Sequence, residues 1–207
     1  QIKASEKTEV KYMQTWEEQI MIRQEGITEG RIEGEKIGRL RGKRELLEKF
    51  NIQLSPIPIP ELTAQMKKVK EEGTEVSKVI KYCKDNMCIK IKEQELENVA
   101  ALKVAMKTLA EKYGCNAIAI QCWNALQDEI GIMPCAANSL LNEEGIPVVC
   151  ETDIHGAITA VMAEAAGMDE TRTFFADWTV RHPDNENGEL LQHCGPWPVS
   201  VAKEKPT

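Results

Sequence analysis

The chain has 207 residues, of which 42% are hydrophobic and 29% are charged, an ordinary balance for a globular protein. Its 33 acidic and 26 basic residues give a net charge of −7, whereas nucleic-acid binders are more often basic. We therefore expect a globular protein with no nucleic-acid partner, long enough for one sizeable α/β core or for one domain and part of another.

Seven cysteines are spread along the chain, most of them in apolar segments. Their odd number and dispersed positions do not form a disulfide framework, and the absence of a Cys-x-x-Cys pair argues against structural zinc. No run of about 18 apolar residues predicts a membrane span, and the polar segment from Gln1 to Val10 is not a signal peptide. Free, buried thiols and no membrane partner are what we expect of a cytoplasmic protein.

Residues 1–50 form a charged, mainly helical N-terminal segment in which glycine recurs at every fourth position, at Gly26, Gly30, Gly34, Gly38 and Gly42. This spacing places the glycines near one face of a helix, where another backbone can approach closely. The alternative is a weak or irregular helix, because each interior glycine costs about 0.5–1 kcal/mol relative to alanine. The chain begins with Gln rather than Met, which predicts a processed or excised chain.

Residues 51–170 form the predicted α/β domain. It opens with a short strand at 52–54 and a proline-rich connection, from which Pro60 leads into the first turn of a helix. Helical residues then extend to about residue 87, with a break near Gly73.

The clearest helix carries apolar residues at three- and four-residue steps from Leu96 to Tyr113. Two all-apolar strands, 117–120 and 146–150, are each typical of a parallel sheet that is covered on both faces. Helices at 136–144 and 156–166 complete an alternation of helix and strand. This order predicts an α/β fold with a three-layer, doubly wound (flavodoxin- or Rossmann-like) parallel sheet.

Residues 171–207 have a different pattern. Thr, Phe and Trp are frequent at 171–180, which favours a strand. The segment 181–188 is rich in turn-forming residues, and 190–193 is a plausible returning strand. We expect a C-terminal β-hairpin that begins a second, β-rich domain.

Three polar side chains, one after a predicted strand and two within predicted strands, form a candidate metal site. Glu151 stands at the carboxyl end of the second parallel strand, where ligands bind in open α/β sheets. Asp177 and His193 lie in the two strands of the hairpin. Carboxylate and imidazole ligands suit Mn²⁺, Mg²⁺, Co²⁺ or Fe²⁺, provided that the three residues converge in space. The alternative is that the carboxylates face solvent and that the histidine is packed or on the surface.

Other residues near these segments have both a functional and a structural interpretation. Asp153 is expected to cap the helix that follows it. Gln121 and Trp123 end the first parallel strand, and with Trp178 they are candidate substrate-binding residues. The tryptophans are suited to stacking on a sugar ring, and the alternative is that both pack in the core. No partner marks any cysteine as a nucleophile, and buried, inert thiols are the default.

Five segments carry a resemblance to a known family. They are Gly145–Ala157, Phe174–Trp178, His193–Gly195, Ala117–Trp123 and the pair Pro134–Cys135. Together they resemble the L-fucose isomerase family and its L-arabinose isomerase relatives, from about residue 90 to residue 200. The family's members are far longer, so the chain is similar to their middle domain and the start of their C-terminal domain.

The resemblance implies a metal-dependent intramolecular oxidoreductase that interconverts aldoses and ketoses of the L-fucose, D-arabinose or L-arabinose type through an enediolate. It implies a divalent ion, most often Mn²⁺, held by Glu151, Asp177 and His193. Glu151 and Asp177 would also be the catalytic proton-transfer pair. Family members are usually homo-oligomers, so a neighbouring subunit would complete the site, and the isolated chain would not turn over.

The sequence is also compatible with two other functions. The second hypothesis, after the isomerase, is a non-catalytic α/β sugar-binding or regulatory domain that keeps the fold without turnover. The third is an assembly domain whose contact surface is the glycine stripe from Gly26 to Gly42.

Overall fold

A computed structural model describes residues 47, 49–168, 170–193 and 195–206. The chain divides into two compact units, Gln1–Leu54 and Ser55–Thr207, which we describe separately. The glycine stripe lies outside the described residues, and the predicted domain boundaries stay predictions. In the first unit, residues 52–54 form no strand, which corrects the sequence prediction: no described segment pairs with them.

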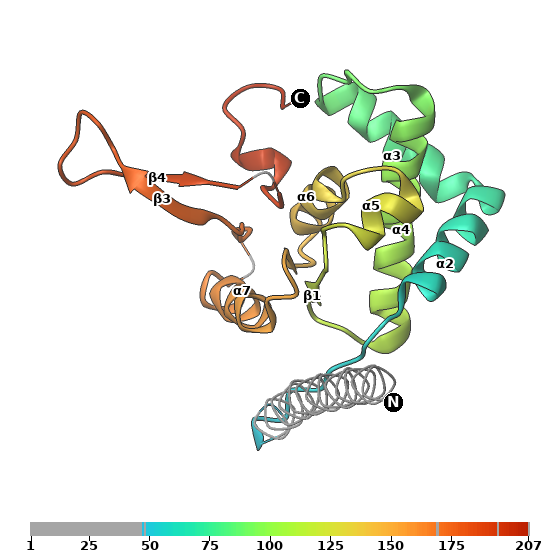
Figure 1. Ribbon diagram of the computed structural model, residues 1–207, viewed down its shortest axis with the longest axis horizontal. Coiled ribbons are helices and arrows are strands. Elements are labelled where there is room, and N and C mark those ends of the chain that lie inside the picture. Colours follow the sequence, from blue (N-terminus) through green and yellow to red (C-terminus); the bar gives the residue numbers. More distant parts are fainter. Residues whose placement is uncertain (1–46, 48, 169, 194, 207) are drawn as a thin grey trace, which may run out of the picture. The chain divides into compact units, whose positions relative to one another are not determined.

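The described part of the second unit contains six α-helices, four short strands and one 3₁₀-helix, shown in Figure 1. In chain order they are α2 (Ile59–Glu72), α3 (Thr74–Asn86), α4 (Glu93–Tyr113), β1 (Ile118–Ala119), α5 (Ala125–Ile130), α6 (Cys135–Glu143), β2 (Val148–Val149), α7 (Ile154–Ala166), β3 (Asp177–Arg181), β4 (Glu189–Gln192) and η1 (Val199–Val201). None of these helices is both long enough and apolar enough to cross a membrane.

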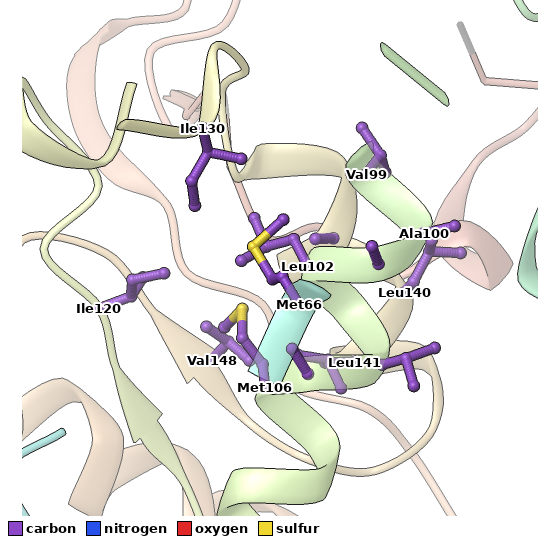
Figure 2. Packing of buried hydrophobic residues seen from close by; sticks show 14 of the residues in the cluster. Met66, Val99, Ala100, Leu102, Met106, Ile120, Ile130, Leu140, Leu141 and Val148 are labelled. Atoms are coloured by element: carbon purple, nitrogen blue, oxygen red, sulfur yellow. The ribbon is translucent and has the colours of Figure 1, made fainter. Parts of the chain in front are cut away.

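Helix α4 is the centre of the core. At its start, Glu95 accepts a hydrogen bond from the backbone N–H of Lys92 (2.8 Å), and at its end Gly114 adopts the left-handed conformation. Helices α2, α3 and α6 pack against it, and Figure 2 shows Met66 of α2 beside Leu102 and Met106 of α4. A fully buried leucine such as Leu102 stabilises a fold by about 1.5–3 kcal/mol relative to exposure.

The break between α2 and α3 lies at Gly73, as predicted. Its φ of 71° is in the left-handed region that favours glycine, and its N–H bonds to the carbonyl of Val69 to close α2. Pro60 lies in the first turn of α2, also as predicted.

The parallel sheet is small. Strands β1 and β2 pair in parallel, with Ile118 opposite Val148 and Ala119 opposite Val149, and α6 and α7 pack against them. The observed fold is therefore mixed helix and sheet with a parallel pair, as an α/β class requires. The described residues contain no third parallel strand, so the three-layer, doubly wound sheet stays a prediction.

The predicted hairpin is present. Strands β3 and β4 pair antiparallel from Asp177 opposite Gln192, with an irregularity between Trp178 and Val180, and extend away from the helices in Figure 1. Strand β3 begins later than predicted, at Asp177, and before it the backbone N–H of Thr173 bonds to the carboxylate of Glu164 in α7. Every residue of both strands is exposed, including the apolar side chains of Trp178, Val180, Leu190 and Leu191.

A buried amide joins the parallel sheet to the C-terminal segment. The side chain of Asn142, at the end of α6, is almost fully buried. Its Oδ1 accepts a hydrogen bond from the N–H of Val148 in β2, and its Nδ2 donates one to the carbonyl of Pro196, both at 2.6 Å. Because an unpaired buried polar group costs about 1–3 kcal/mol, both bonds are required for this amide to be tolerated inside the fold.

A cluster of charges joins α4 to the end of α6. Glu144 accepts hydrogen bonds from Lys103, which is buried, and from Lys107 (2.9 Å). Burial alone raises the pKa of the Glu144 carboxyl, but the two lysine hydrogen bonds outweigh it, and the pKa lies below its ordinary value of 4.5.

We predict that Glu144→Gln destabilises the chain by about 1 kcal/mol at pH 7, because it leaves buried Lys103 without its anion. A carboxyl whose pKa is lowered by folding stabilises the fold above its unfolded pKa, and this contribution is lost as the pH falls through the folded pKa. The difference between the two proteins in urea unfolding should therefore shrink below about pH 4.5. The exposed Glu71→Gln is the control, and a pH-independent difference would contradict the prediction.

Candidate functional site

The candidate site begins at the carboxyl edge of the parallel pair. Gln121 and Trp123 follow β1, and Glu151 follows β2. The N–H of Thr152 bonds to the carbonyl of Ile120 (3.0 Å), so the two segments remain joined past the ends of the strands. The structure thus places three of the predicted site residues on segments that leave the same sheet edge.

The backbone at this edge is strained. Glu151 and Thr152 have φ values of 62° and 56°, and the N–H of Asp153 bonds to the carbonyl of Cys150 (3.2 Å) across them. After β1, Asn124 also has a positive φ of 56°. Such conformations cost about 1–3 kcal/mol at residues other than glycine and cluster at functional sites. The tight turn leaves the side chain of Glu151 exposed.

Asp153 caps helix α7, as predicted. Its Oδ1 accepts a hydrogen bond from the N–H of Gly156 at 3.0 Å. A Cβ at residue 156 would lie 2.5 Å from Oδ2 of Asp153 and 3.1 Å from Cε2 of Phe175. Glycine is therefore required at this position, because it lets the cap and the aromatic ring approach the helix together.

Asp153→Ala should destabilise the fold by about 1 kcal/mol, the usual cost of losing an N-cap, whereas Asp153→Asn should cost much less because its amide oxygen still accepts the bond. Urea unfolding of the two variants checks this. Equal destabilisation by both would show that the charge, and not the cap, matters at this position.

The hairpin brings together two of the three predicted metal ligands. Asp177 is the first residue of β3, and His193 directly follows β4. His193 Nδ1 lies 2.9 Å from Asp177 Oδ2. The two side chains differ in environment, since 59% of the Asp177 side chain is exposed but only 6% of the His193 side chain.

Aromatic residues enclose His193. Its ring and that of Phe175 make a T-shaped contact, with centroids 5.2 Å apart, and the indole N–H of Trp197 donates to the His193 carbonyl (3.1 Å). Trp197 in turn stacks on Phe174, with centroids 4.3 Å apart. Trp197 was not predicted as a site residue, and only its position between two prolines marks it in the sequence.

Helix α7 fixes the segment that leads into β3. Glu164 is buried and accepts hydrogen bonds from the N–H (3.2 Å) and the hydroxyl (3.1 Å) of Thr173. Residues 174–177 therefore leave a fixed point on α7, which determines where Phe175 and Asp177 lie.

The three predicted ligands do not form one complete cluster. Within the residues that the structure describes, no group of three His, Cys, Asp or Glu side chains is arranged to hold a metal ion. The exposed carboxylates of Glu151 and Asp177 are the kind of ligand that Mn²⁺ and Mg²⁺ prefer. His193 Nδ1 faces Asp177, and its other ring nitrogen, Nε2, is buried with no hydrogen-bond partner. Among the described residues, the structure therefore brings Asp177 and His193 together, and the metal site stays a prediction.

The candidate substrate-binding residues lie on the surface. Gln121 is exposed, and 59% of Trp123 and 75% of Trp178 are exposed. The alternative that the two tryptophans pack in the core is thus wrong. Their rings are free of the core because Trp123 lies in the turn after β1 and Trp178 in the exposed hairpin.

Buried thiols lie beneath the site. Burial, together with the nearby thiols of Cys122 and Cys135, raises the pKa of the Cys150 thiol to about 12. Asn138 Nδ2 lies 3.7 Å from the Cys150 sulfur. Cys150 is therefore an uncharged, inert thiol at neutral pH, as predicted, and not a nucleophile.

We predict that iodoacetamide at pH 8 labels exposed Cys88 in the folded chain and leaves Cys150 unlabelled. With a pKa of about 12, only about one in 10,000 Cys150 thiols is ionised at that pH. Peptide mass spectrometry measures both sites, and labelling in urea is the control in which both should react. Equal labelling rates in the folded chain would contradict the burial of Cys150.

Comparison with known proteins finds similarity to sugar isomerases. The chain is 27% identical over 161 residues to a sulfoquinovose isomerase of Alkalicoccus urumqiensis, and 29% identical over 171 residues to one of a Clostridium species (strain MSTE9). A sulfoquinovose isomerase of Priestia megaterium is 24% identical. Each match covers 77% of this chain but only 35% of the relative. No protein-family model matches the chain.

These relatives confirm the coarser part of the sequence expectation, a resemblance to sugar isomerases. The L-fucose type is not among their names, and it stays a prediction. The chain spans about a third of their length, so the activity of the whole protein is a matter for proposal.

Proposed function

We propose that this chain carries part of the active site of an aldose–ketose isomerase. The observation that carries the proposal is the similarity to sugar isomerases over 77% of the chain. It is supported by the polar segments at the carboxyl edge of β1 and β2 and by the contact between Asp177 and His193. The two parallel strands are, in this proposal, part of a doubly wound sheet of the whole enzyme.

Glu151 and Asp177 are the proposed proton-transfer pair and the proposed carboxylate ligands of a divalent ion, Mn²⁺ by the family resemblance. When bound, such an ion polarises the substrate's oxygens as a Lewis acid. In the reaction, one carboxylate takes the proton from C2 of the aldose and the pair returns a proton to C1, while the hydroxyl proton moves from O2 to O1. The oxidation at C2 and the reduction at C1 then balance within one molecule.

The proposed substrates are small sugars. The family resemblance favours L-fucose, D-arabinose or L-arabinose, and the names of the relatives add a sulfonated hexose, sulfoquinovose. The exposed faces of Trp123 and Trp178 are suited to stacking on a sugar ring. We also propose that the whole enzyme is a cytoplasmic homo-oligomer and that ligands missing from this chain come from the rest of that assembly.

Glu151→Gln should weaken Mn²⁺ binding by about tenfold or more, because it replaces a charged ligand with a neutral amide. Electron paramagnetic resonance of free Mn²⁺ measures the affinity, and the exposed Glu129→Gln is the matched control. A substrate of the site should also tighten Mn²⁺ binding to the unmodified chain. We would test the three sugars above and sulfoquinovose.

Failure of the unmodified chain to bind Mn²⁺ would contradict the proposed metal site. Ketose formation by the isolated chain would show that its site is complete, contrary to the expectation that it does not turn over alone. The second candidate function is that of a non-catalytic sugar-binding module. It predicts that a sugar binds equally well to the chain and to Glu151→Gln, with or without Mn²⁺.

A further inference from the structure

We propose that the exposed face of helix α7 binds the same face of a second copy of this chain, so that two copies associate through an antiparallel pair of α7 helices. This contact gives the homo-oligomer of the proposed function a surface, and to that extent it rests on the proposed function. It involves neither a metal ion nor a sugar. Its test measures assembly alone, so a negative result would leave the isomerase proposal standing.

Helix α7 is apolar but mostly uncovered. Of its 13 residues only Ala157 and Glu164 are buried, whereas α4 buries apolar residues along its whole length. Met162 is 67% exposed, and Met168, just past the end of α7, is 77% exposed. Figure 1 shows α7 at the margin of the second unit, beside β1. A continuous apolar face that is open to solvent on a folded chain marks an interaction site.

The exposed face of α7 is also uncharged. With histidine neutral, Glu164 is the one charged side chain of the helix, and it is buried against Thr173. Lysines and acidic residues, by contrast, dominate the exposed faces of α2 and α3. Because the chain carries a net charge of −7, two copies repel each other overall. An uncharged face is therefore the place where a second copy can approach, and it offers no anion to a basic partner.

The exposed residues have the spacing of a coiled-coil seam. His155, Thr159, Met162 and Ala166 are all exposed, and steps of four, three and four residues place them in one row along the helix. The hydroxyl of Thr159 donates a hydrogen bond to the carbonyl of His155 (2.8 Å), so this polar group is already satisfied within the helix. The row can therefore be buried in a contact without leaving that hydroxyl unpaired.

The sizes of the side chains in this row fit the same row in the reverse direction. Two α7 helices that run in opposite directions place Met162 of one copy against Thr159 of the other, and His155 against Ala166. Each large side chain then meets a small one, as in knobs-into-holes packing. A parallel pair would instead place Met162 against Met162 and His155 against His155. The row is thus complementary to itself, as a two-fold contact requires, and opposed helix dipoles favour the same arrangement.

Met162→Glu tests the contact, because it places an uncompensated charge where the two helices meet. We expect the unmodified chain to be a dimer in sedimentation equilibrium and this variant to raise the dissociation constant of the dimer by about tenfold or more. Ile91→Glu is the matched control, since Ile91 is also exposed (47%) but lies between α3 and α4, outside the row. Circular dichroism and urea unfolding check that both variants keep the fold.

A double variant tests the direction of the helices. Thr159→Lys combined with Met162→Glu should restore the dimer, because the antiparallel pair places the introduced cation of one copy opposite the introduced anion of the other. A parallel pair would place like charges together and would not be restored. A double variant that stays monomeric would therefore overturn the antiparallel pairing.

Hydrogen exchange on the unmodified chain makes the test independent of how the variants fold. The amides of α7 should become more protected as the chain concentration rises through the dissociation constant, and those of α2 should not. A monomeric chain at every concentration would overturn the contact and assign the face of α7 to another part of the enzyme. A dimer that Met162→Glu leaves equally stable would overturn it too, because another surface, such as the hairpin, would then join the copies.

Discussion

The two hydrogen bonds of the buried Asn142 amide are the constraint on which the site depends. One bond fixes the start of β2, whose end lies two residues before Glu151, and the other fixes Pro196, three residues after His193. A single side chain at the end of α6 is thus hydrogen-bonded to the segments that carry the two halves of the candidate site, which lie far apart in the sequence. Helix α6 is itself packed on α4, so the position of both halves is finally set by the hydrophobic core.

The site combines a rigid base with exposed functional groups. Strained turns after the strands, the capped start of α7 and the enclosed imidazole all fix backbone or ring positions. The side chains of Glu151 and Asp177 remain exposed to water. Exposed carboxylates are accessible to a hydrated cation and to a polar substrate. The buried thiol of Cys150, by contrast, contributes only to packing.

The sequence predicted features that depend on local chemistry. The three- and four-residue spacing in α4, the glycine at the α2–α3 break, the Asp153 cap and the turn residues of the hairpin each act within a few residues. Features that depend on distant contacts were missed or misplaced. Helix α5 follows an unusual backbone conformation at Asn124, residues 52–54 find no partner strand, and Trp197 reaches His193 only in the folded chain.

Gly195 makes the site vulnerable at a position that touches neither metal ion nor sugar in our account. A Cβ there would lie 2.6 Å from Cδ2 of the His193 ring, closer than two such atoms can stand. Any other side chain at residue 195 must displace the imidazole and, with it, the carboxylate that the imidazole holds. A substitution of Gly195 should therefore have the same effect as a substitution of Asp177. Second substitutions that make room around the His193 ring should reverse that effect.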